Sequence, residues 1–359
     1  MAQFYYLLGA GASVEIIPTV RDFSHSMKNL SVKQKIINIT NAGNFNHPEI
    51  KSLVKNDLEN ESRRIQSISN SFESFGSPDI YAKYLFANSS TKDLSELKHY
   101  LTIFIQLMEY FQKDGKPDQR YFEFIAQLID GHKRFPKNVV IANWNYDNQF
   151  ELAMKNFSNE LQWNANIDRG HTGSGPYPPM YYEYKINGGA YFTPSTNSKI
   201  HIHSNIPKNI NDYDFILSIL KGFSEFKNYQ SGIKFAFEND SEVVDKLIQK
   251  IETIPNSSNT TYLTIIGYSF PVFNREVDKQ ILNALLNKGL RRIYIQDPNP
   301  EELKRKIMGF FDESDKKDII DLRTEFIGAT FKTTSRDGLP FEKISNYPFH
   351  IPMEFTPVY

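Results

Sequence analysis

The sequence predicts an α/β protein with a doubly wound, mostly parallel sheet and a large α-helical insertion. Short apolar runs recur along the chain, and each ends at glycine or at polar turn residues. Amphipathic helical patterns follow most of these runs, which is the alternation expected when helices join parallel strands. After the first run, however, a long stretch contains only helical patterns and polar loops, and this stretch indicates the insertion.

The predicted strands are rich in β-branched and aromatic residues, as is typical of strands that are buried on both faces. The segment "NSKIHIHSNI" instead alternates in hydrophobicity, as a half-buried strand does. The runs that we interpret as strands are Phe4–Leu8, Val139–Ala142 and Thr261–Ile266, and the segment "LRRIYIQDPNP" is interpreted as a further strand that ends in turn residues from Gln296 to Asn299.

Helical periodicity defines the insertion and the domain boundaries. Two neighbouring segments carry apolar residues at helical spacing, so each predicts a helix with one buried face: Leu97, Leu101, Phe104, Met108 and Phe111 in the first, and Tyr121, Phe124, Ile125 and Leu128 in the second. We predict a core made of residues 1–25 and 135–300, a helical insertion at 26–134, and a C-terminal helix with an extended arm at 301–359.

Composition excludes several classes of protein. With 359 residues the chain can bury a large core. The net charge of −1 provides no excess of Lys and Arg for binding nucleic-acid phosphates. No apolar run reaches the ~20 residues that span a bilayer, and the N-terminus lacks the basic and apolar regions of a signal peptide. We therefore expect a cytoplasmic protein with no membrane partner and no indication of nucleic-acid binding.

The chain contains no cysteine, which excludes disulfides, thiol nucleophiles and thiolate zinc sites. Of the eight histidines, only His201 and His203 lie close together in the sequence. Alternate positions on a strand face the same side, so this pair could bind a metal. No third ligand is indicated, however, and we predict a partly solvated pair and no metal.

The segment "GAGAS", Gly9–Ser13, follows the first predicted strand. Its closely spaced N–H groups and small side chains suit a pyrophosphate near the start of a helix. Val14 stands where the usual dinucleotide motif has its third glycine, and no lysine follows as in a phosphate loop. On this motif alone, a nucleotide site and an ordinary tight turn remain alternatives.

Polar side chains also follow the second predicted strand, in the segment "NWNYD". If the strand continues, Asn143, Asn145 and Asp147 alternate and point to one side. The alternative is a turn followed by an aspartate helix cap, which is common for Asn and Asp.

Four motifs occur in order along the chain: "LLGAGAS" with the later Pro18, then "NYD", "KINGG", and "GYSF" followed by an aspartate. Together they resemble the sirtuin-like proteins of bacteria, which include NAD-hydrolysing effectors of anti-phage defence. The resemblance covers roughly residues 1–25 and 135–300. It implies a Rossmann-like fold that binds NAD as the substrate.

The resemblance also implies roles for individual residues. In that family the first motif holds the NAD pyrophosphate, and the asparagine of "NYD" lies at the nicotinamide ribose. Asn145 is therefore the candidate catalytic residue, with Asp147 beside it as an orienting group or helix cap. The implied nucleotide contacts are Gly9, Ala10, Gly11, Ala12, Ser13, Pro18, Thr19, Gly267, Tyr268, Ser269, Asp297 and Asn299.

One position departs from the family pattern. The family usually carries a histidine before glycine in a "K-L-H-G" segment, and here Asn187 of "YKINGG" occupies that position. An asparagine cannot act as a general base near neutral pH. Either the Asn145 and Asn187 amides only orient water, or His171 or His201 replaces the base, or the site binds NAD without cleaving it.

The resemblance implies an NAD glycohydrolase that releases nicotinamide and ADP-ribose, acting in antiviral defence and abortive infection after a partner or signal activates it. Expected partners are further copies of the chain or a second defence protein, either a nucleotide-sensing subunit or a motor ATPase. The alternatives are a non-catalytic sensor of NAD or ADP-ribose and a zinc-free deacylase. Sirtuin deacylases generally hold zinc with four thiolates, so the absence of cysteine disfavours the deacylase.

Overall fold

A computed structural model describes residues 2–29, 63–113, 117–132, 134–157, 167–168, 181–193, 229–238, 242–253, 260–311, 323–327 and 348–359. The chain divides into two compact units. The sheet unit comprises Met1–Glu15, Lys116–Asn187 and Ala236–Tyr359, and the helical unit comprises Ile16–Gly115 and Gly188–Phe235. This division differs from the expected boundaries, because residues 116–134 and 301–359 belong with the sheet, while 16–25 and 188–235 belong with the helices.

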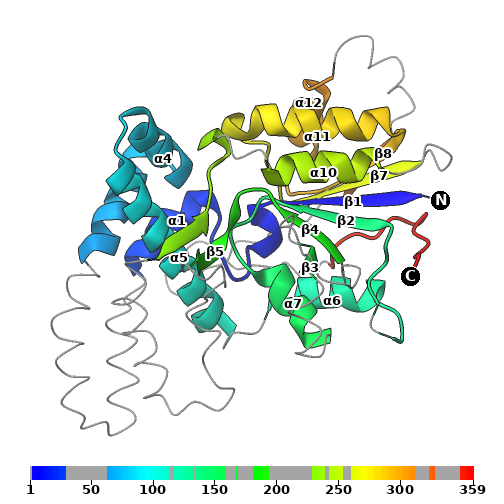
Figure 1. Ribbon diagram of the computed structural model, residues 1–359, viewed down its shortest axis with the longest axis horizontal. Coiled ribbons are helices and arrows are strands. Elements are labelled where there is room, and N and C mark those ends of the chain that lie inside the picture. Colours follow the sequence, from blue (N-terminus) through cyan, green and yellow to red (C-terminus); the bar gives the residue numbers. More distant parts are fainter. Residues whose placement is uncertain are drawn as a thin grey trace, which may run out of the picture. The chain divides into compact units, whose positions relative to one another are not determined.

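A parallel sheet forms the centre of the sheet unit, which confirms the predicted doubly wound, Rossmann-like α/β class (Figure 1). Its seven described strands have the order β3-β4-β2-β1-β7-β8-β9, and every described pair is parallel. The strands are β1 (Gln3–Leu8), β2 (Val139–Asn143), β3 (Ile167–Asp168), β4 (Tyr181–Lys185), β7 (Thr261–Ile266), β8 (Leu290–Gln296) and β9 (Arg323–Ile327).

The central strand β1 is buried on both faces. Phe4, Tyr6 and Leu8 contribute to the core on one face, whereas Tyr5 and Leu7 contribute to the core on the other. None of the five side chains is more than 2% exposed. Successive side chains of a strand point to opposite faces, so a strand covered on both sides must be apolar throughout. This is the reason for the unbroken run "FYYLL".

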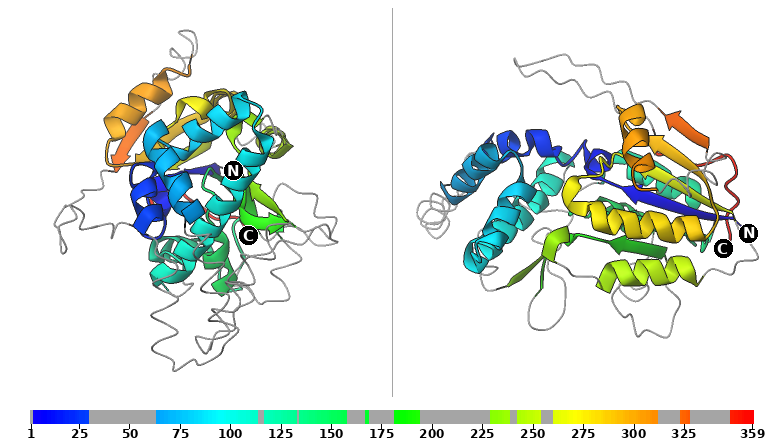
Figure 2. Two further views of the ribbon diagram at one scale, coloured as in Figure 1. Left: turned by 90° about the vertical axis from the view of Figure 1, so that its left-hand side faces the viewer. Right: turned by 90° about the horizontal axis from the view of Figure 1, so that it is seen from above.

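Helices cover both faces of the sheet, as a doubly wound fold requires (Figure 2). On the face of Phe4 lie α6 (Gln119–Leu128) and α7 (Gln149–Phe157). On the face of Tyr5 lie α10 (Glu242–Glu252), α11 (Arg275–Asn287) and α12 (Pro300–Met308). Helix α6 was predicted within the insertion, but its apolar side chains pack on the sheet instead.

The C-terminal arm, residues 348–359, is docked on the same face as α6. Phe355 contacts Phe4 edge to face, with ring centroids 5.0 Å apart, and Phe349 contacts Tyr121 in the same way at 4.9 Å. Backbone contacts extend along the arm: Lys137 N donates to Val358 O at 2.7 Å. The arm therefore completes the core on this face.

Replacing Phe349 with alanine should lower the free energy of unfolding by about 3–5 kcal/mol, because the buried ring leaves a cavity among aromatic neighbours. Denaturant unfolding measures the loss. Met353→Ala is the control within the arm, since Met353 is 97% exposed and its replacement should change stability by less than about 0.5 kcal/mol. Equal losses in the two variants would show that the arm is not docked through Phe349.

The helical unit contains α1 (Val20–Asn29), α4 (Pro78–Ala87) and α5 (Thr91–Lys113). The predicted apolar face of α5 is buried at Leu97, Leu101, Phe104 and Met108. Strands β5 (Gly188–Thr193) and β6 (Gln230–Ile233) form an antiparallel pair that the sequence did not predict. Gln106 of α5 donates from Nε2 to Ala190 O at 2.6 Å. No helix in the described part of the chain has the length and apolar character needed to cross a membrane.

Candidate functional site

The carboxyl ends of the parallel strands meet at one edge of the sheet. From β1 the chain adds β2 and β4 on one side, and β7 and β8 lie on the other. The topological switch point therefore lies between β1 and β7. In open α/β sheets, ligands bind outside the strand ends at such a point. The two glycine-led segments of the sequence, Gly9–Ser13 and Gly267–Phe270, follow these two strands directly.

The two glycine turns interlock through their backbones. Gly9 N donates to Ile266 O at 3.0 Å, and Gly11 N donates to Gly267 O at 2.9 Å. A Cβ atom on Gly11 would lie 2.7 Å from the Gly267 Cα, closer than real Cβ contacts. Gly267 itself has a φ of +59°, which favours glycine. Close backbone contact is thus one physical reason for these glycines.

The contact between the two turns occupies some of the backbone N–H groups that we predicted would bind a pyrophosphate. The Gly9 and Gly11 N–H groups bond to β7 and its turn, and Ala12 N donates to Gly9 O at 2.8 Å. Ala10 is exposed at the start of a short 3₁₀ helix, η1 (Ala10–Ser13), and no described contact uses its N–H. Phosphate binding by this turn stays a prediction, with Ala10 as its most accessible donor.

Asn145 connects the end of β2 to the β1 turn. Its Nδ2 donates to Gly9 O at 2.8 Å and to Ser13 Oγ at 3.2 Å, and its own N–H donates to Asn143 Oδ1 at 2.9 Å. Strand β2 ends at Asn143, so the strand alternation considered for "NWNYD" is not what aligns these residues. A local turn and two long-range hydrogen bonds place the buried Asn145 carboxamide beside the glycine turn instead.

Asp147 caps helix α7. Its Oδ1 accepts from Gln149 N at 3.1 Å, which is the helix-cap alternative considered from the sequence. The carboxyl group is buried, and burial raises its pKa, although the charge of Lys185 and hydrogen bonds from Ser13 and Gln149 act in the opposite direction. Lys185 Nζ donates to the Asp147 carbonyl and to Asn148 Oδ1. These contacts fix the loop between β2 and α7.

Helix α6 also holds the β1 turn, and sequence reasoning missed this role. Tyr121 Oη lies 2.9 Å from Ser13 Oγ, and Arg120 donates from Nη2 to Ala12 O at 2.8 Å. Arg120 also pairs with Asp118 at 2.7 Å. Burial acts to lower the pKa of Arg120, but Asp118 and Glu15 outweigh burial and raise it.

The helical spacing of the sequence could have identified Arg120 as a buried, paired charge. Arg120 lies four residues before Phe124, so it falls on the apolar face of a helix, where an unpaired charge is rarely found.

Asn187 lies two residues beyond the end of β4, against the segment that follows β2. Its Nδ2 donates to Trp144 O at 3.3 Å. Its Oδ1 is buried and has no hydrogen-bond partner among the described residues. A buried acceptor of this kind calls for a ligand or water. Because Trp144 directly precedes Asn145, this hydrogen bond places Asn187 close to the "NWNYD" segment that carries Asn145.

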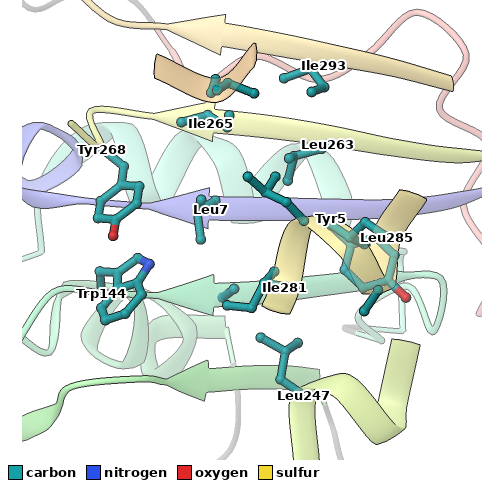
Figure 3. Packing of buried hydrophobic residues seen from close by; sticks show 14 of the residues in the cluster. Tyr5, Leu7, Trp144, Leu247, Leu263, Ile265, Tyr268, Ile281, Leu285 and Ile293 are labelled. Atoms are coloured by element: carbon teal, nitrogen blue, oxygen red, sulfur yellow. The ribbon is translucent and has the colours of Figure 1, made fainter. Parts of the chain in front are cut away.

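The turn after β7 directs its side chains in different directions. The Tyr268 ring is buried and stacks on Trp144, with centroids 5.5 Å apart and planes 5° from parallel (Figure 3). Ser269 is exposed, and its carbonyl accepts from Lys306 Nζ at 3.3 Å. Phe270 has a φ of +52° and packs on Tyr268 at 4.7 Å. The Tyr268 side chain therefore belongs to the core, which leaves Ser269 as the side chain that faces solvent.

The remaining candidates are spread out. Asp297 follows β8 and its Oδ1 accepts from Asn299 N at 2.8 Å, while partial burial raises the pKa of Asp297.

Pro18 and Thr19 fall in the helical unit, where Thr19 Oγ1 donates to Asp22 at the start of α1. His171 and His201 lie outside the described residues. Within the described ranges, no group of three His, Asp or Glu side chains could hold a metal ion.

The fold and these contacts define an α/β protein with a Rossmann-like parallel sheet and a polar cluster at its switch point. No protein-family model matches the chain, and no curated protein matches it at a significant level.

Proposed function

We propose that the protein is an NAD glycohydrolase that breaks the nicotinamide–ribose bond and releases nicotinamide and ADP-ribose. The observation that carries this proposal is the Asn145 carboxamide, which is fixed by Gly9 O and Ser13 Oγ at the switch point. The sirtuin-like motif order supports NAD as the nucleotide. The proposed binding groups are the Gly9–Ser13 turn for the pyrophosphate, and Ser269, Asp297 and Asn299 for the remainder of the nucleotide.

The proposed reaction is dissociative. The bond between C1′ of the ribose and the nicotinamide nitrogen breaks, and the electron pair leaves with nicotinamide. Water then adds to the oxocarbenium-like carbon and loses a proton to solvent. Asn145 Nδ2 is used by the protein, so we assign its Oδ1 to a ribose hydroxyl or to the attacking water. The buried Asn187 Oδ1 would accept a second such bond. Rigidly held dipoles of this kind stabilise a changing charge without reorganising.

In the cell, NAD depletion would make the protein an antiviral defence effector that acts after activation. The proposed activator is self-assembly or a second defence protein, either a nucleotide-sensing subunit or a motor ATPase. Incubating the purified chain with NAD, alone and with the product of the neighbouring gene, tests the activity. We expect nicotinamide release in at least one of the two preparations, and release in neither would refute the catalytic proposal.

The second candidate function is binding of NAD or ADP-ribose without cleavage. It is favoured by Asn187, which cannot take a proton from water near neutral pH. Calorimetry would distinguish the two functions, because this candidate predicts tight binding while NAD remains intact. Loss of NAD only in the presence of an acylated peptide would instead indicate a zinc-free deacylase.

Replacing Asn187 with alanine should lower kcat for NAD cleavage by about 10²-fold, because the amide that orients water or the ribose is lost. The expected change in KM is small, since the pyrophosphate contacts remain. Asn156→Ala is the control, as Asn156 is an exposed asparagine of α7 whose Nδ2 donates to Leu152 O of the same helix. A wild-type kcat for the Asn187 variant would make Asn187 a bystander.

A further inference from the structure

A buried carboxyl group lies directly behind the turn that follows β7. Asp278, in the first turn of α11, is 1% exposed. The Tyr268 hydroxyl donates toward both of its oxygens, with distances of 2.9 Å to each. Asn274 Nδ2 in turn donates to the Tyr268 hydroxyl at 2.9 Å. An amide, a hydroxyl and a carboxyl group thus form one continuous chain of hydrogen bonds.

This chain of hydrogen bonds is connected to both segments that carry the candidate site. Tyr268 follows Gly267, whose backbone touches Gly11. Trp144, on which Tyr268 stacks, precedes Asn145. Figure 3 shows the Tyr268 and Trp144 rings next to one another beyond the ends of β1 and β2, with the Tyr268 hydroxyl pointing toward the indole. A movement of the Tyr268 ring would therefore disturb both turns.

Among the residues that the structure describes, no cation lies close enough to stabilise an ionised Asp278. Burial raises the pKa of Asp278 to about 8. The Tyr268 hydroxyl and the Trp144 indole lower this pKa, but they offset the effect of burial only in part. The indole N–H makes no hydrogen bond of normal geometry with the described residues. Helix α10 packs against α11 with apolar side chains, Val244, Leu247 and Ile251 among them. The charged neighbours on α11, Arg275, Glu276 and Lys279, are exposed. No charge from any of these elements, nor from Lys306 of α12, contributes to the shift.

We propose that Asp278 is a positioning residue that holds a proton and thereby fixes the Gly267–Phe270 turn, the Trp144 ring and, through them, the nucleotide site. The link to nucleotide rests on the proposed function. Once ionised, the carboxylate is an unpaired charge among aromatic rings, a state that folded proteins relieve by admitting water or moving the charge outward. Relief here requires the Tyr268 ring to move, and the turn moves with it.

The direction of the pH effect follows from linkage. An aspartate has a pKa near 3.8 when exposed and about 8 in this site. Between these values the folded protein holds a proton that the unfolded chain has lost. The protonated Asp278 therefore makes its full contribution to the free energy of unfolding below about pH 3.8. This contribution decreases as the pH rises from there to about pH 8. Near neutral pH the group is mostly protonated, and mild alkali ionises it.

Trp144 provides a spectroscopic test. The chain has two tryptophans, so Trp163→Phe leaves Trp144 as the only one. In that background we expect the fluorescence to titrate with a midpoint of about 8. The transition should be absent in Asp278→Asn and unchanged in Glu276→Gln, an exposed carboxylate of the same helical turn. Tyr268→Phe removes a bond to the carboxylate and should move the midpoint to higher pH, which provides a second variant if Asp278→Asn does not fold.

Calorimetry with ADP-ribose connects the titration to the site. If only the protonated form binds, affinity at one pH unit above the midpoint should be about tenfold weaker than at one unit below it, and Asp278→Asn should show no such change. A flat Trp144 signal in the Asp278-containing protein would overturn the proposal. A titrating signal with no binding of ADP-ribose at either pH would support the positioning role of Asp278 and refute the proposed function.

Discussion

Asn145→Ala should reduce kcat for NAD cleavage by at least about 10²–10³-fold, and it should also lower the free energy of unfolding by about 1–3 kcal/mol. The loss of activity follows from removing the carboxamide that faces the ribose in the proposed reaction. The loss of stability follows from the contacts of the same group, because Gly9 O and Ser13 Oγ lose a buried donor. Turnover assays and denaturant unfolding measure the two effects.

The two effects can be separated with Asn138→Ala. Asn138 is also buried, and its Nδ2 also donates to two protein oxygens, Ala2 O and Thr356 O, at 3.0 Å each. It lies at the opposite end of β2 from Asn145. We expect a similar loss of stability with activity retained. If Asn138→Ala loses as much activity as Asn145→Ala, destabilisation alone explains both variants, and a fully active Asn145→Ala would move the active site elsewhere.

Gly267→Ala should lower the free energy of unfolding by about 2–5 kcal/mol. Its φ of +59° disfavours any side chain by about 1–2 kcal/mol, and the added Cβ would collide with the Gly11 backbone, which adds about 1–3 kcal/mol for overpacking. Thermal or denaturant unfolding provides the measurement. The collision also pushes the two turns apart, so we expect nucleotide binding to weaken.

Gly76→Ala measures the cost of a positive φ without any steric collision. Gly76 has a φ of +81°, but a Cβ there meets no atom within 4 Å. Its replacement should therefore lower stability by only about 1–2 kcal/mol. Equal losses at the two positions would mean that the turns after β1 and β7 separate easily and that their contact is not tight.

Much of the fold follows from local sequence patterns. Strands β1, β2 and β7 were predicted because each is a run rich in apolar or β-branched residues that stops at glycine or polar residues, and β8 was predicted because "LRRIYIQ" ends in the turn residues "DPNP". The partner of a helix was harder to predict, because periodicity defines an apolar face without showing what covers it. The prediction that α6 belongs to the insertion was therefore wrong, because Tyr121 and Phe124 pack in the core around β1. The β5–β6 pair was missed because its partners are separated by residues 194–229.

The site shows a similar limit. The motifs lie at the ends of β1, β2 and β7, but the contacts of their residues depend on neighbours that no local pattern encodes. Tyr268 turns into the core, and Asp147 caps a helix. Asn145, expected at an open strand end, is buried in the structure. Helical spacing places Arg120 on an apolar face, and Asp278 is the aspartate that follows "GYSF", but the hydrogen bonds that give these two side chains their roles are visible only in the structure.

The interlocked turns have an evolutionary consequence. Positions 11 and 267 belong to distant parts of the sequence, yet neither has room for a methyl group while the other backbone stays in place. Descendants of this chain should therefore inherit the two glycines together. A lineage that lost one of them would have to rebuild the opposite loop, so co-variation of these two positions among relatives would record this contact.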